Sequence, residues 1–334
     1  MTLRSFFLAT AAVAVAAPAL AGVNIYTTRQ PELIQPVMDA FTAQTGIAVN
    51  LAFVESGIVE RLKAEGRRSP ADLVMTVDIA SLQQIVEADV VQPVENDVVT
   101  AAIPAELRSP DNLWFGLTTR ARIVYASRDR VADGEVTTYE DLASDSWAGR
   151  ICTRSGTHPY NLALLAAVIA HDGAEAAQAW AAGVHDNLAR RPEGNDRAQV
   201  KAIWAGECDI SLGNTYYMGQ MLADPEQAEW ANSVRIIFPT FEDGGTHVNI
   251  SGVAMTKSAP NKDEAMQLLE FLVSPEAQGI YAELNNEYPI LEWAPLSDLV
   301  ASWGSFDADT TDLTEIAGHR AQALQIMEIV NFDG

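Results

Sequence analysis

Two tyrosine-bearing segments carry the side chains of this sequence that are best suited to chemistry. One segment reads CTRSGTHPY and the other reads CDISLGNTYY, so Cys152 stands eight positions before Tyr160 and Cys208 stands eight positions before Tyr216. Each tyrosine is expected at the start of a helix, where the positive end of the helix dipole favours the phenolate. Phenolate is a hard, anionic oxygen ligand that suits hard cations. Metal ligation is therefore one interpretation, although ordinary packing of amphipathic tyrosines is the commoner reason for such a pattern.

The equal spacing also bears on the two cysteines, which are the only ones in the chain. If the two segments follow neighbouring strands in register, both tyrosines face one crevice and Cys152 lies close to Cys208. A disulfide and a pair of buried free thiols both remain open on this reasoning. The sequence has no Cys-x-x-Cys, which excludes a thioredoxin-like redox motif.

The first 21 residues predict the compartment. They combine a basic residue, Arg4, with a short apolar run over 6–17 and the small-x-small sequence Ala19-Leu20-Ala21. This pattern is typical of a secretory signal peptide over 1–21, because the apolar run is too short to span a membrane. We expect an extracytoplasmic, oxidising location and no stable membrane insertion.

The charge balance excludes some partners but does not identify a ligand. The 334 residues include 21 basic and 45 acidic side chains, for a formal net charge of −24. Such a charge argues against nucleic acid, whose phosphates attract Lys and Arg, and against anionic lipid surfaces. It suggests a cation ligand only weakly, because net charge governs solubility and steering, not the site.

The elements that would position these tyrosines alternate between strands and helices, and the length predicts two domains. We expect strands over 23–27, 47–54, 71–77, 147–153, 208–212 and 248–256. We expect helices from 31 to Gly46 and over 58–65, 79–88, 160–172, 199–205, 262–273 and 275–284, with another beginning at Tyr216. Near-continuous apolar strands between amphipathic helices indicate an α/β fold of two lobes, each a mostly parallel sheet flanked by helices. Ligands bind such sheets beyond the carboxyl ends of the strands, which here include the two tyrosine segments.

Several long stretches resemble one known family. They are VNIYTTRQPELIQPVMDAFTAQTGIAVN, SPADLVMTVD, WFGLTTRARIVYASRDR, ICTRSGTHPYNLALLAAVIAHDG, RPEGNDRAQVKAIWAGE, GNTYYMG, HVNISGVAMTKSAPNK and YAELNNEYP. In this order they resemble the periplasmic ferric-ion-binding proteins of ABC transporters over essentially the whole mature chain. The resemblance implies a type II periplasmic binding protein with a hinge of crossing strands. It implies lobe one over 22–118 and 247–297 and lobe two over 119–246 and 298–334. It also implies a periplasmic monomer that is not an enzyme and that delivers iron to an inner-membrane ABC permease.

The same resemblance assigns a ligand set. The family tyrosine that opens the helix after the RSG loop falls on Tyr160. The tyrosine pair of the GN-x-YY motif falls on Tyr216 and Tyr217. In the family these three tyrosines bind Fe³⁺. Arg120, in the TTR segment, resembles the family residue that holds a synergistic anion, which the resemblance implies is carbonate or bicarbonate. The loop residues Ser155, Gly156 and Thr157 would add anion contacts from hydroxyl and backbone N–H groups.

Two departures from the family pattern concern accessory ligands. Many relatives carry a His-Tyr pair where this chain reads Gln30-Pro31, which points to the subclass that uses three tyrosines and an anion. His158 lies in the anion loop, where a loop role is favoured over ligation, and the Pro159 that follows has no N–H to offer. Gln30, Asp78 and His158 are therefore candidate accessory residues, with a helix N-cap the simpler role for Asp78.

Two other functions stay open as alternatives. A binding protein of the same fold could take a small anion or organic molecule without iron, using Arg120 and the helix N-termini. A hydrolytic enzyme would need Cys152 or a serine with a histidine, and the sequence has neither Gly-x-Ser-x-Gly nor His-Glu-x-x-His. Of the remaining candidates, Arg122 is expected to form a structural or gating pair, and capping explains 195–197.

Overall fold

The structure, a computed structural model, describes residues 22–291 and 293–334. The expected signal peptide over 1–21 therefore lies outside the described residues. The strands are β1 (Gly22–Thr27), β2 (Ala48–Phe53), β3 (Leu73–Thr76), β4 (Val91–Gln92), β5 (Phe115–Ser127), β6 (Ile151–Cys152), β7 (Ile210–Asn214), β8 (Val234–Ile237), β9 (Val248–Thr256) and β10 (Tyr288–Pro289). The helices are α1 (Gln35–Thr45), α2 (Ile58–Glu65), α3 (Ile79–Glu87), α4 (Asp97–Ala102), α5 (Pro159–Asp172), α6 (Ala174–Asp186), α7 (Asp196–Ala205), α8 (Tyr216–Ala223), α9 (Ala228–Asn232), α10 (Lys262–Leu272), α11 (Pro275–Asn285), α12 (Asp298–Ser302), α13 (Leu313–Gly318) and α14 (Arg320–Ile329).

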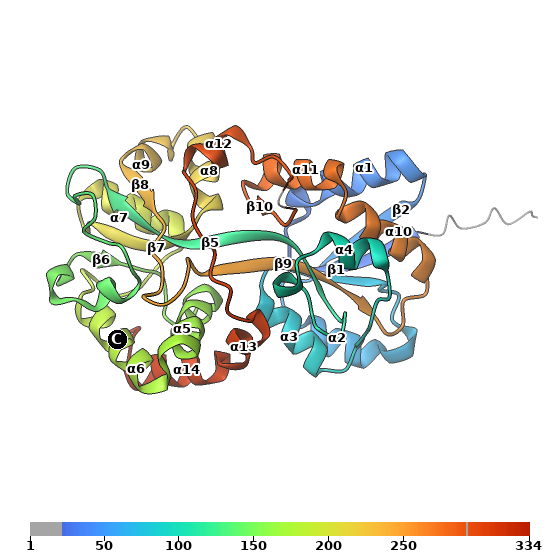
Figure 1. Cartoon of the computed structure of the whole chain (residues 1–334), viewed down its shortest axis with the longest axis horizontal. Helices are drawn as coiled ribbons and strands as arrows, with labels where there is room; N and C mark the ends of the chain where they lie inside the picture. The colour runs from blue at the N-terminus through green and yellow to red at the C-terminus, as the bar shows by residue number, and fades with distance from the viewer. Residues whose placement is uncertain (1–21, 292) are drawn as a thin grey trace, which may run out of the picture.

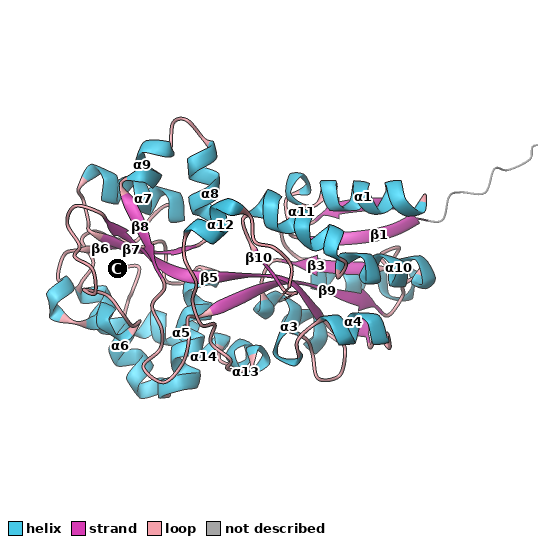
Figure 2. Cartoon of the chain, turned by 45° about the horizontal axis from the view of Figure 1, so that its top comes forward, coloured by secondary structure: helices cyan, strands magenta, loops and turns pink. Residues whose placement is uncertain are grey.

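The chain forms two α/β lobes joined by two long strands, β5 and β9 (Figures 1 and 2). The strand order is β2-β1-β3-β9-β5-β7-β6, with β1 parallel to β2 and β3, and β6 parallel to β7. Both β9 and β5 run antiparallel to their neighbours. The expected fold class, two sheets flanked by helices with a hinge of crossing strands, is confirmed.

Strand β5 belongs to both lobes. Its first part, over 115–121, pairs with β9 in the lobe that contains β1 to β3. Its second part, over 122–126, pairs with β7 in the other lobe. The expected lobe boundaries near 118 and 247 lie within β5 and just before β9, and they stay a prediction.

Each lobe is built around strands and helices with continuous apolar surfaces. All nine residues of β9 are buried, as expected for a central strand covered on both faces. In lobe one, Phe41 of α1 packs on Phe271 of α10 with ring centroids 5.5 Å apart. In lobe two, α5 lies against α6 and α14 and buries Leu162, Leu165 and Val168. Each large aliphatic side chain buried in this way contributes about 1.5–3 kcal/mol.

The chain returns between the lobes near its end. After α11 in lobe one, it passes through α12 and a long segment that runs across β5 and β9 to α13 and α14 in lobe two (Figure 1).

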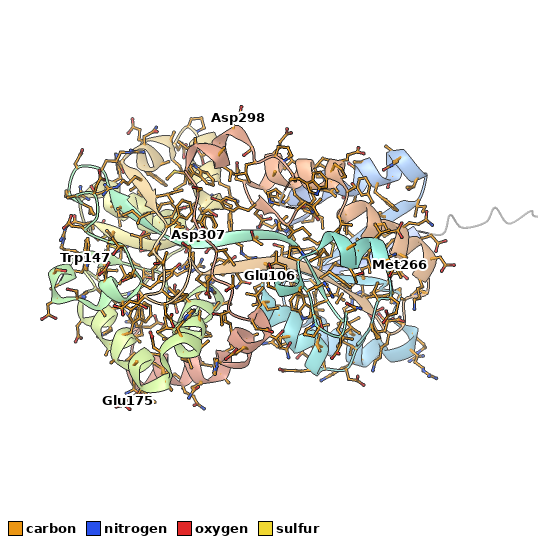
Figure 3. All side chains as sticks on the ribbon, viewed as in Figure 1. Glu106, Trp147, Glu175, Met266, Asp298 and Asp307 are labelled. Carbon is orange, nitrogen blue, oxygen red and sulfur yellow. A yellow bond between two sulfur atoms is a disulfide. The ribbon has the colours of Figure 1, made fainter. Side chains whose placement is uncertain are left out.

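The surface carries the acidic charge, as Glu175 and Asp298 at opposite edges of the molecule illustrate (Figure 3). No helix of residues 22–291 and 293–334 is both long and apolar enough to cross a membrane.

Two predicted strands differ from the structure. The strand expected over 147–153 is reduced to Ile151–Cys152, because a 3₁₀ turn ends at Trp147 and Gly149 adopts φ 71°. The strand expected over 208–212 instead runs from Ile210 to Asn214. The helix expected from residue 31 begins as a 3₁₀ turn, Pro31–Leu33, and continues as α1.

Cys152 and Cys208 form a disulfide, with Cα atoms 5.9 Å apart. Both side chains are buried in the lobe that carries the tyrosine segments. The bond ties the end of β6 to the residues that lead into β7, so it joins the two strands that precede Tyr160 and Tyr216.

We predict that the paired substitution Cys152→Ser and Cys208→Ser lowers the free energy of unfolding by about 2–4 kcal/mol, because the cross-link restricts the unfolded chain. Urea unfolding followed by circular dichroism measures the change. Wild-type protein unfolded in reductant is the matched control and should lose a similar amount. Equal stability of the oxidised wild type and the double variant would contradict the bridge.

Candidate functional site

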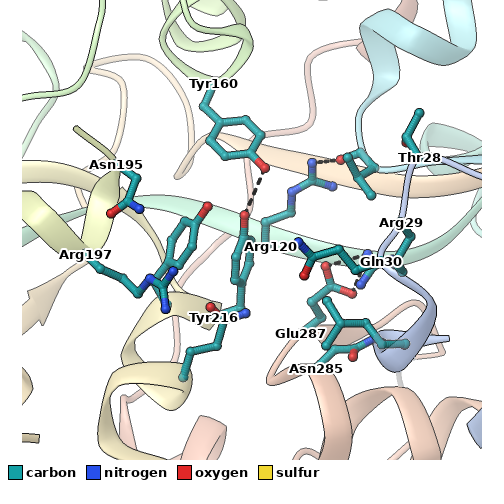
Figure 4. Close-up of a pocket in the computed structure, with 14 residues that line it drawn as sticks. Thr28, Arg29, Gln30, Arg120, Tyr160, Asn195, Arg197, Tyr216, Asn285 and Glu287 are labelled. Carbon is teal, nitrogen blue, oxygen red and sulfur yellow. Dashed lines mark hydrogen bonds and ion pairs between the residues drawn. The ribbon is translucent and has the colours of Figure 1, made fainter. Parts of the chain in front are cut away.

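A polar cavity of about 260 Å³ lies between the lobes, beside β5. Its lining comes from both lobes and from the crossing strand (Figure 4). The lining residues are Thr28, Arg29, Gln30, Leu33, Val77, Arg120, Tyr160, Asn195, Arg197, Tyr216, Tyr217, Gln220, Asn285 and Glu287. The carboxyl ends of β1, β3 and β7 open toward this cavity through Thr28, Val77 and Tyr216, where a ligand of an α/β sheet is expected.

The three tyrosines meet on one wall of this cavity. Tyr160 lies in the first turn of α5, and Tyr216 and Tyr217 form the first turn of α8. The Tyr216 hydroxyl donates a hydrogen bond to the Tyr160 hydroxyl with an O···O distance of 3.0 Å (Figure 4). The rings of Tyr216 and Tyr217 lie 4.4 Å apart between centroids. Three phenol oxygens from two helix starts therefore point into one small volume.

Burial keeps the hydroxyls of Tyr216 and Tyr217 protonated in the absence of a bound cation. Burial and the neighbouring phenols raise the pKa of Tyr216 well above its usual value, while Arg120 acts in the opposite direction. Burial, followed by the nearby Tyr160, raises the pKa of Tyr217 to about 12. A cation that binds phenolate must therefore displace protons, because the ligand atoms have to be deprotonated.

Arg120 extends from β5 to the middle of the cavity with spare donor capacity. One of its terminal nitrogens, Nη2, donates to the carbonyl oxygen of Val77 in lobe one. The other, Nη1, is buried and has no hydrogen-bond partner among the described residues. A buried, unpartnered guanidinium N–H requires an acceptor, and an anionic oxygen is the acceptor it binds most strongly.

The cavity is positively charged although the whole chain is acidic. Arg29, Arg120 and Arg197 line it, and Glu287 is the only carboxylate among the described lining residues. Glu287 is already engaged, because it accepts from Arg29 at 2.9 Å and from the Thr118 hydroxyl at 2.7 Å. Among the described residues, no group of three His, Cys, Asp or Glu side chains could hold a metal ion. Apart from the Glu287 carboxylate, the side-chain oxygens of the described lining residues belong to phenols, amides and the Thr28 hydroxyl.

Behind the tyrosines, Asp196 forms the centre of a buried ionic network. Its carboxylate is fully buried and pairs with Arg122 of β5 at 2.9 Å and with Arg154 at 3.1 Å. Arg122 also donates to the side-chain oxygen of Asn161 at 2.6 Å and to that of Asn214 at 3.2 Å. Asn161 follows Tyr160 and Asn214 precedes Tyr216, so the network fixes the backbone on which the phenols stand.

The predicted anion loop does not line the cavity. Ser155, Gly156 and Thr157 all direct donors to the carboxylate of Asp333, with distances of 2.6 Å, 2.7 Å and 3.4 Å. These donors are occupied by a carboxylate of the chain itself. Of the four residues expected to contact an anion, the structure brings Arg120 to the tyrosines and leaves the loop outside.

The candidate accessory residues have different places. His158 is the N-cap of α5, where its Nδ1 accepts from the Tyr160 N–H at 3.2 Å, and burial lowers its pKa to about 4. Asp78 caps α3 by accepting from the Ser81 N–H at 2.8 Å. Gln30 alone of the three lines the cavity.

Several lining residues were not singled out in the sequence. Arg29 and Glu287 lie in quoted stretches, TTRQP and NNEYP, but their pairing joins positions 258 residues apart and no local pattern indicates it. The capping pattern over 195–197 does not mark Arg197 as a lining residue, and no local pattern marks Gln220. Asp196 belongs to the same capping pattern but forms two ion pairs, and the sequence does not indicate that this residue is fully buried.

The fold and the cleft together define a two-lobed solute-binding protein. The chain belongs to the bacterial extracellular solute-binding protein family, whose profile matches residues 37–308. It is 44% identical to iron uptake protein A1 of Synechocystis sp. over 308 residues, which span 91% of this chain and 86% of that protein. It is similar to ferric iron-binding protein A of Mannheimia haemolytica in an open conformation, with 47% identity, a TM-score of 0.90, and coverage of 94% and 99%. A Trichodesmium protein solved with iron and citrate ligands is 42% identical, with a TM-score of 0.90 and coverage of 93% and 100%.

We predict that Asp196→Ala lowers the free energy of unfolding by about 3–5 kcal/mol, because it leaves the buried guanidinium of Arg122 and the largely buried one of Arg154 without their carboxylate. Urea unfolding at neutral pH measures the loss. Asp133→Ala is the matched control, since it breaks the surface Arg235–Asp133 pair and should change stability only slightly. Equal effects of the two substitutions would contradict the central role of Asp196.

Proposed function

We propose that this protein captures ferric iron in the periplasm and delivers it to an inner-membrane ABC permease. The convergence of three tyrosine hydroxyls beside the unpartnered Nη1 of Arg120 carries the proposal. The names of the relatives and their 42–47% identity over nearly the whole chain support the same cargo.

The donor chemistry agrees with a trivalent, hard cation. Three phenolates from Tyr160, Tyr216 and Tyr217 would neutralise Fe³⁺, and phenolate oxygen is a hard ligand. Three oxygens leave the coordination shell incomplete. A synergistic anion held by Arg120 would complete it, and would also separate the cation from the guanidinium charge.

The class of that anion is a small oxyanion that can bind metal and guanidinium together. Carbonate or bicarbonate fits this description, and so does a carboxylate such as the citrate found with iron in the Trichodesmium relative. The cavity of about 260 Å³ has room for either. We assign the anion to Arg120 and not to Ser155, Gly156 and Thr157, because the donors of that loop already bind Asp333.

Lobe closure would complete the site. The described residues of lobe one contribute Gln30 and the Arg29–Glu287 pair to the cavity wall. Closure of the hinge would exclude water from the iron, as in other two-lobed binding proteins. Loss of the anion or protonation of a phenolate would weaken ligation and allow release to the permease.

The positive lining also favours one alternative, a protein of the same fold that binds an anion without iron. Arg120 and Arg197 both line the cavity, and each has one buried guanidinium nitrogen with no hydrogen-bond partner among the described residues, which supports this alternative. Ferric binding and anion binding differ in one readout, because only tyrosinate bound to Fe³⁺ produces a visible charge-transfer band.

We predict that apo protein titrated with ferric citrate develops this visible band and that Tyr216→Phe weakens iron binding by more than about 100-fold. Loss of a direct ligand should exceed the about 10–100-fold cost of losing an outer-shell partner. Tyr281→Phe is the matched control, since it removes a buried hydroxyl that does not line the cavity. If the wild type shows no band, but citrate alone raises its melting temperature, the anion-binding alternative is correct.

We also predict that iron binding releases protons and strengthens with rising pH. The raised pKa values of Tyr216 and Tyr217 mean that both phenols are neutral near pH 7 before iron binds. Each must lose its proton on ligation, so affinity should rise by up to about tenfold per pH unit for each proton released. A pH indicator in weak buffer counts the protons during titration. Binding without proton release would show that the phenols remain protonated and are not ligands.

A further inference from the structure

The loop between β6 and α5 binds a carboxylate, that of Asp333, which does not line the cavity. Asp333 accepts a hydrogen bond from the Ser155 hydroxyl at 2.6 Å and from the Gly156 N–H at 2.7 Å. The Thr157 hydroxyl adds a longer contact of 3.4 Å. Hydrogen bonds to an ionised acceptor are about twice as strong as neutral ones, so this contact holds the loop firmly.

The residues around Asp333 are arranged to bring its carboxylate to this loop. After α14, Asn331 adopts φ 51°, which turns the chain back toward α5. Phe332 is then buried and packs under Gly156, where a Cβ atom would lie 2.6 Å from the Phe332 ring. Arg191 donates to the backbone carbonyl oxygen of Asp333 at 2.6 Å, which adds a further contact that fixes this residue.

The same loop is held from the inside by the Asp196 network. Arg154, the residue before Ser155, pairs with Asp196, and its guanidinium carbon lies 5.2 Å from the centre of the Tyr160 ring. The side-chain amide of Asn161 donates to the carbonyl oxygens of Arg154 and Ser155, each at 3.1 Å. Two carboxylates therefore hold the loop that leads to Tyr160: Asp196 binds Arg154, and Asp333 binds Ser155 and Gly156.

We propose that Asp333 is a positioning residue for iron binding. Its carboxylate is an anion of the chain itself that orders the loop on which Tyr160 stands. This rests on the proposed function. The Ser155, Gly156 and Thr157 donors form an oxyanion site that the chain fills with its own side chain. With the carboxylate in place, the start of α5 is ordered before iron arrives, and the free synergistic anion is left to Arg120. Without it, three donors lose their acceptor and Tyr160 must be ordered during binding, which lowers affinity.

The test uses the full mature chain with Asp333→Ala, and Asp333→Asn as a second variant that keeps the side-chain shape. Asp312→Ala is the matched control, because Asp312 also accepts backbone N–H bonds, at the start of α13, but does not contact the loop. Titration with ferric citrate in bicarbonate-free buffer measures affinity and the charge-transfer band. Hydrogen exchange of the amides over 156–162 is measured on the iron-free protein, with and without formate, which can replace the missing carboxylate.

We expect Asp333→Ala to weaken iron binding about tenfold, as loss of an outer partner does, and to shift the charge-transfer band, with Asp312→Ala unchanged in both. We expect exchange over 156–162 to be about tenfold faster in Asp333→Ala, and formate to restore it there. Formate should have no effect on the exchange of the wild type or of Asp333→Ala combined with Ser155→Ala.

Unchanged exchange and affinity in Asp333→Ala, or equal effects of Asp312→Ala, would overturn the proposal. Failure of formate to slow the exchange of Asp333→Ala would overturn the oxyanion site. A wild type that binds no iron would overturn the proposed function instead, and the exchange data would still report on the loop.

Discussion

The buried carboxylate of Asp196 is the group on which the geometry of the cleft depends. Removing a carboxylate and two guanidinium groups from water costs several kcal/mol per ion, so such ions persist only when they are paired and hydrogen-bonded. Arg122, Arg154 and the Asn214 N–H meet this requirement, and each belongs to a different segment around the tyrosines. The phenols are consequently held close together before any ligand is present, which reduces the ordering cost of binding.

The charge of the cleft explains why a metal site of this kind needs an anion. A trivalent cation placed beside Arg120 would be repelled, and no free carboxylate lies among the described lining residues to offset the repulsion. Phenolate formation and a bridging oxyanion each remove part of that repulsion. The net charge of −24 belongs to the exposed acidic surface and is opposite in sign to the charge at the cavity.

The sequence predicted the fold class, because strand and helix periodicity are local patterns. The equal spacing from the two cysteines predicted that Tyr160 and Tyr216 share a crevice only if their strands are neighbours in register. The strands β6 and β7 are neighbours and the two hydroxyls meet, but Cys152 pairs with Ser211, three positions beyond Cys208. It did not predict that Asp333 occupies the loop after β6, since that contact joins residues 178 positions apart at Ser155. The Arg29–Glu287 pair was missed for the same reason. Asp196 was assigned to capping because a residue at a helix start looks the same in sequence whether it is exposed or fully buried.

Strand β5 links the tyrosine wall to the junction of the lobes, because its side chains alternate between the two faces of the sheet. Arg120 and Arg122 are two residues apart, so their side chains leave the same face of the strand. Arg122 is bound by Asp196 in lobe two, whereas Arg120 donates to Val77 in lobe one and keeps one N–H free. The strand therefore anchors one arginine in the rigid network behind the tyrosines and places the other at the junction of the lobes. A hinge motion that separates Val77 from β5 would change the contacts of Arg120 while leaving the tyrosine wall intact, so anion binding is the part of the site most directly coupled to lobe closure.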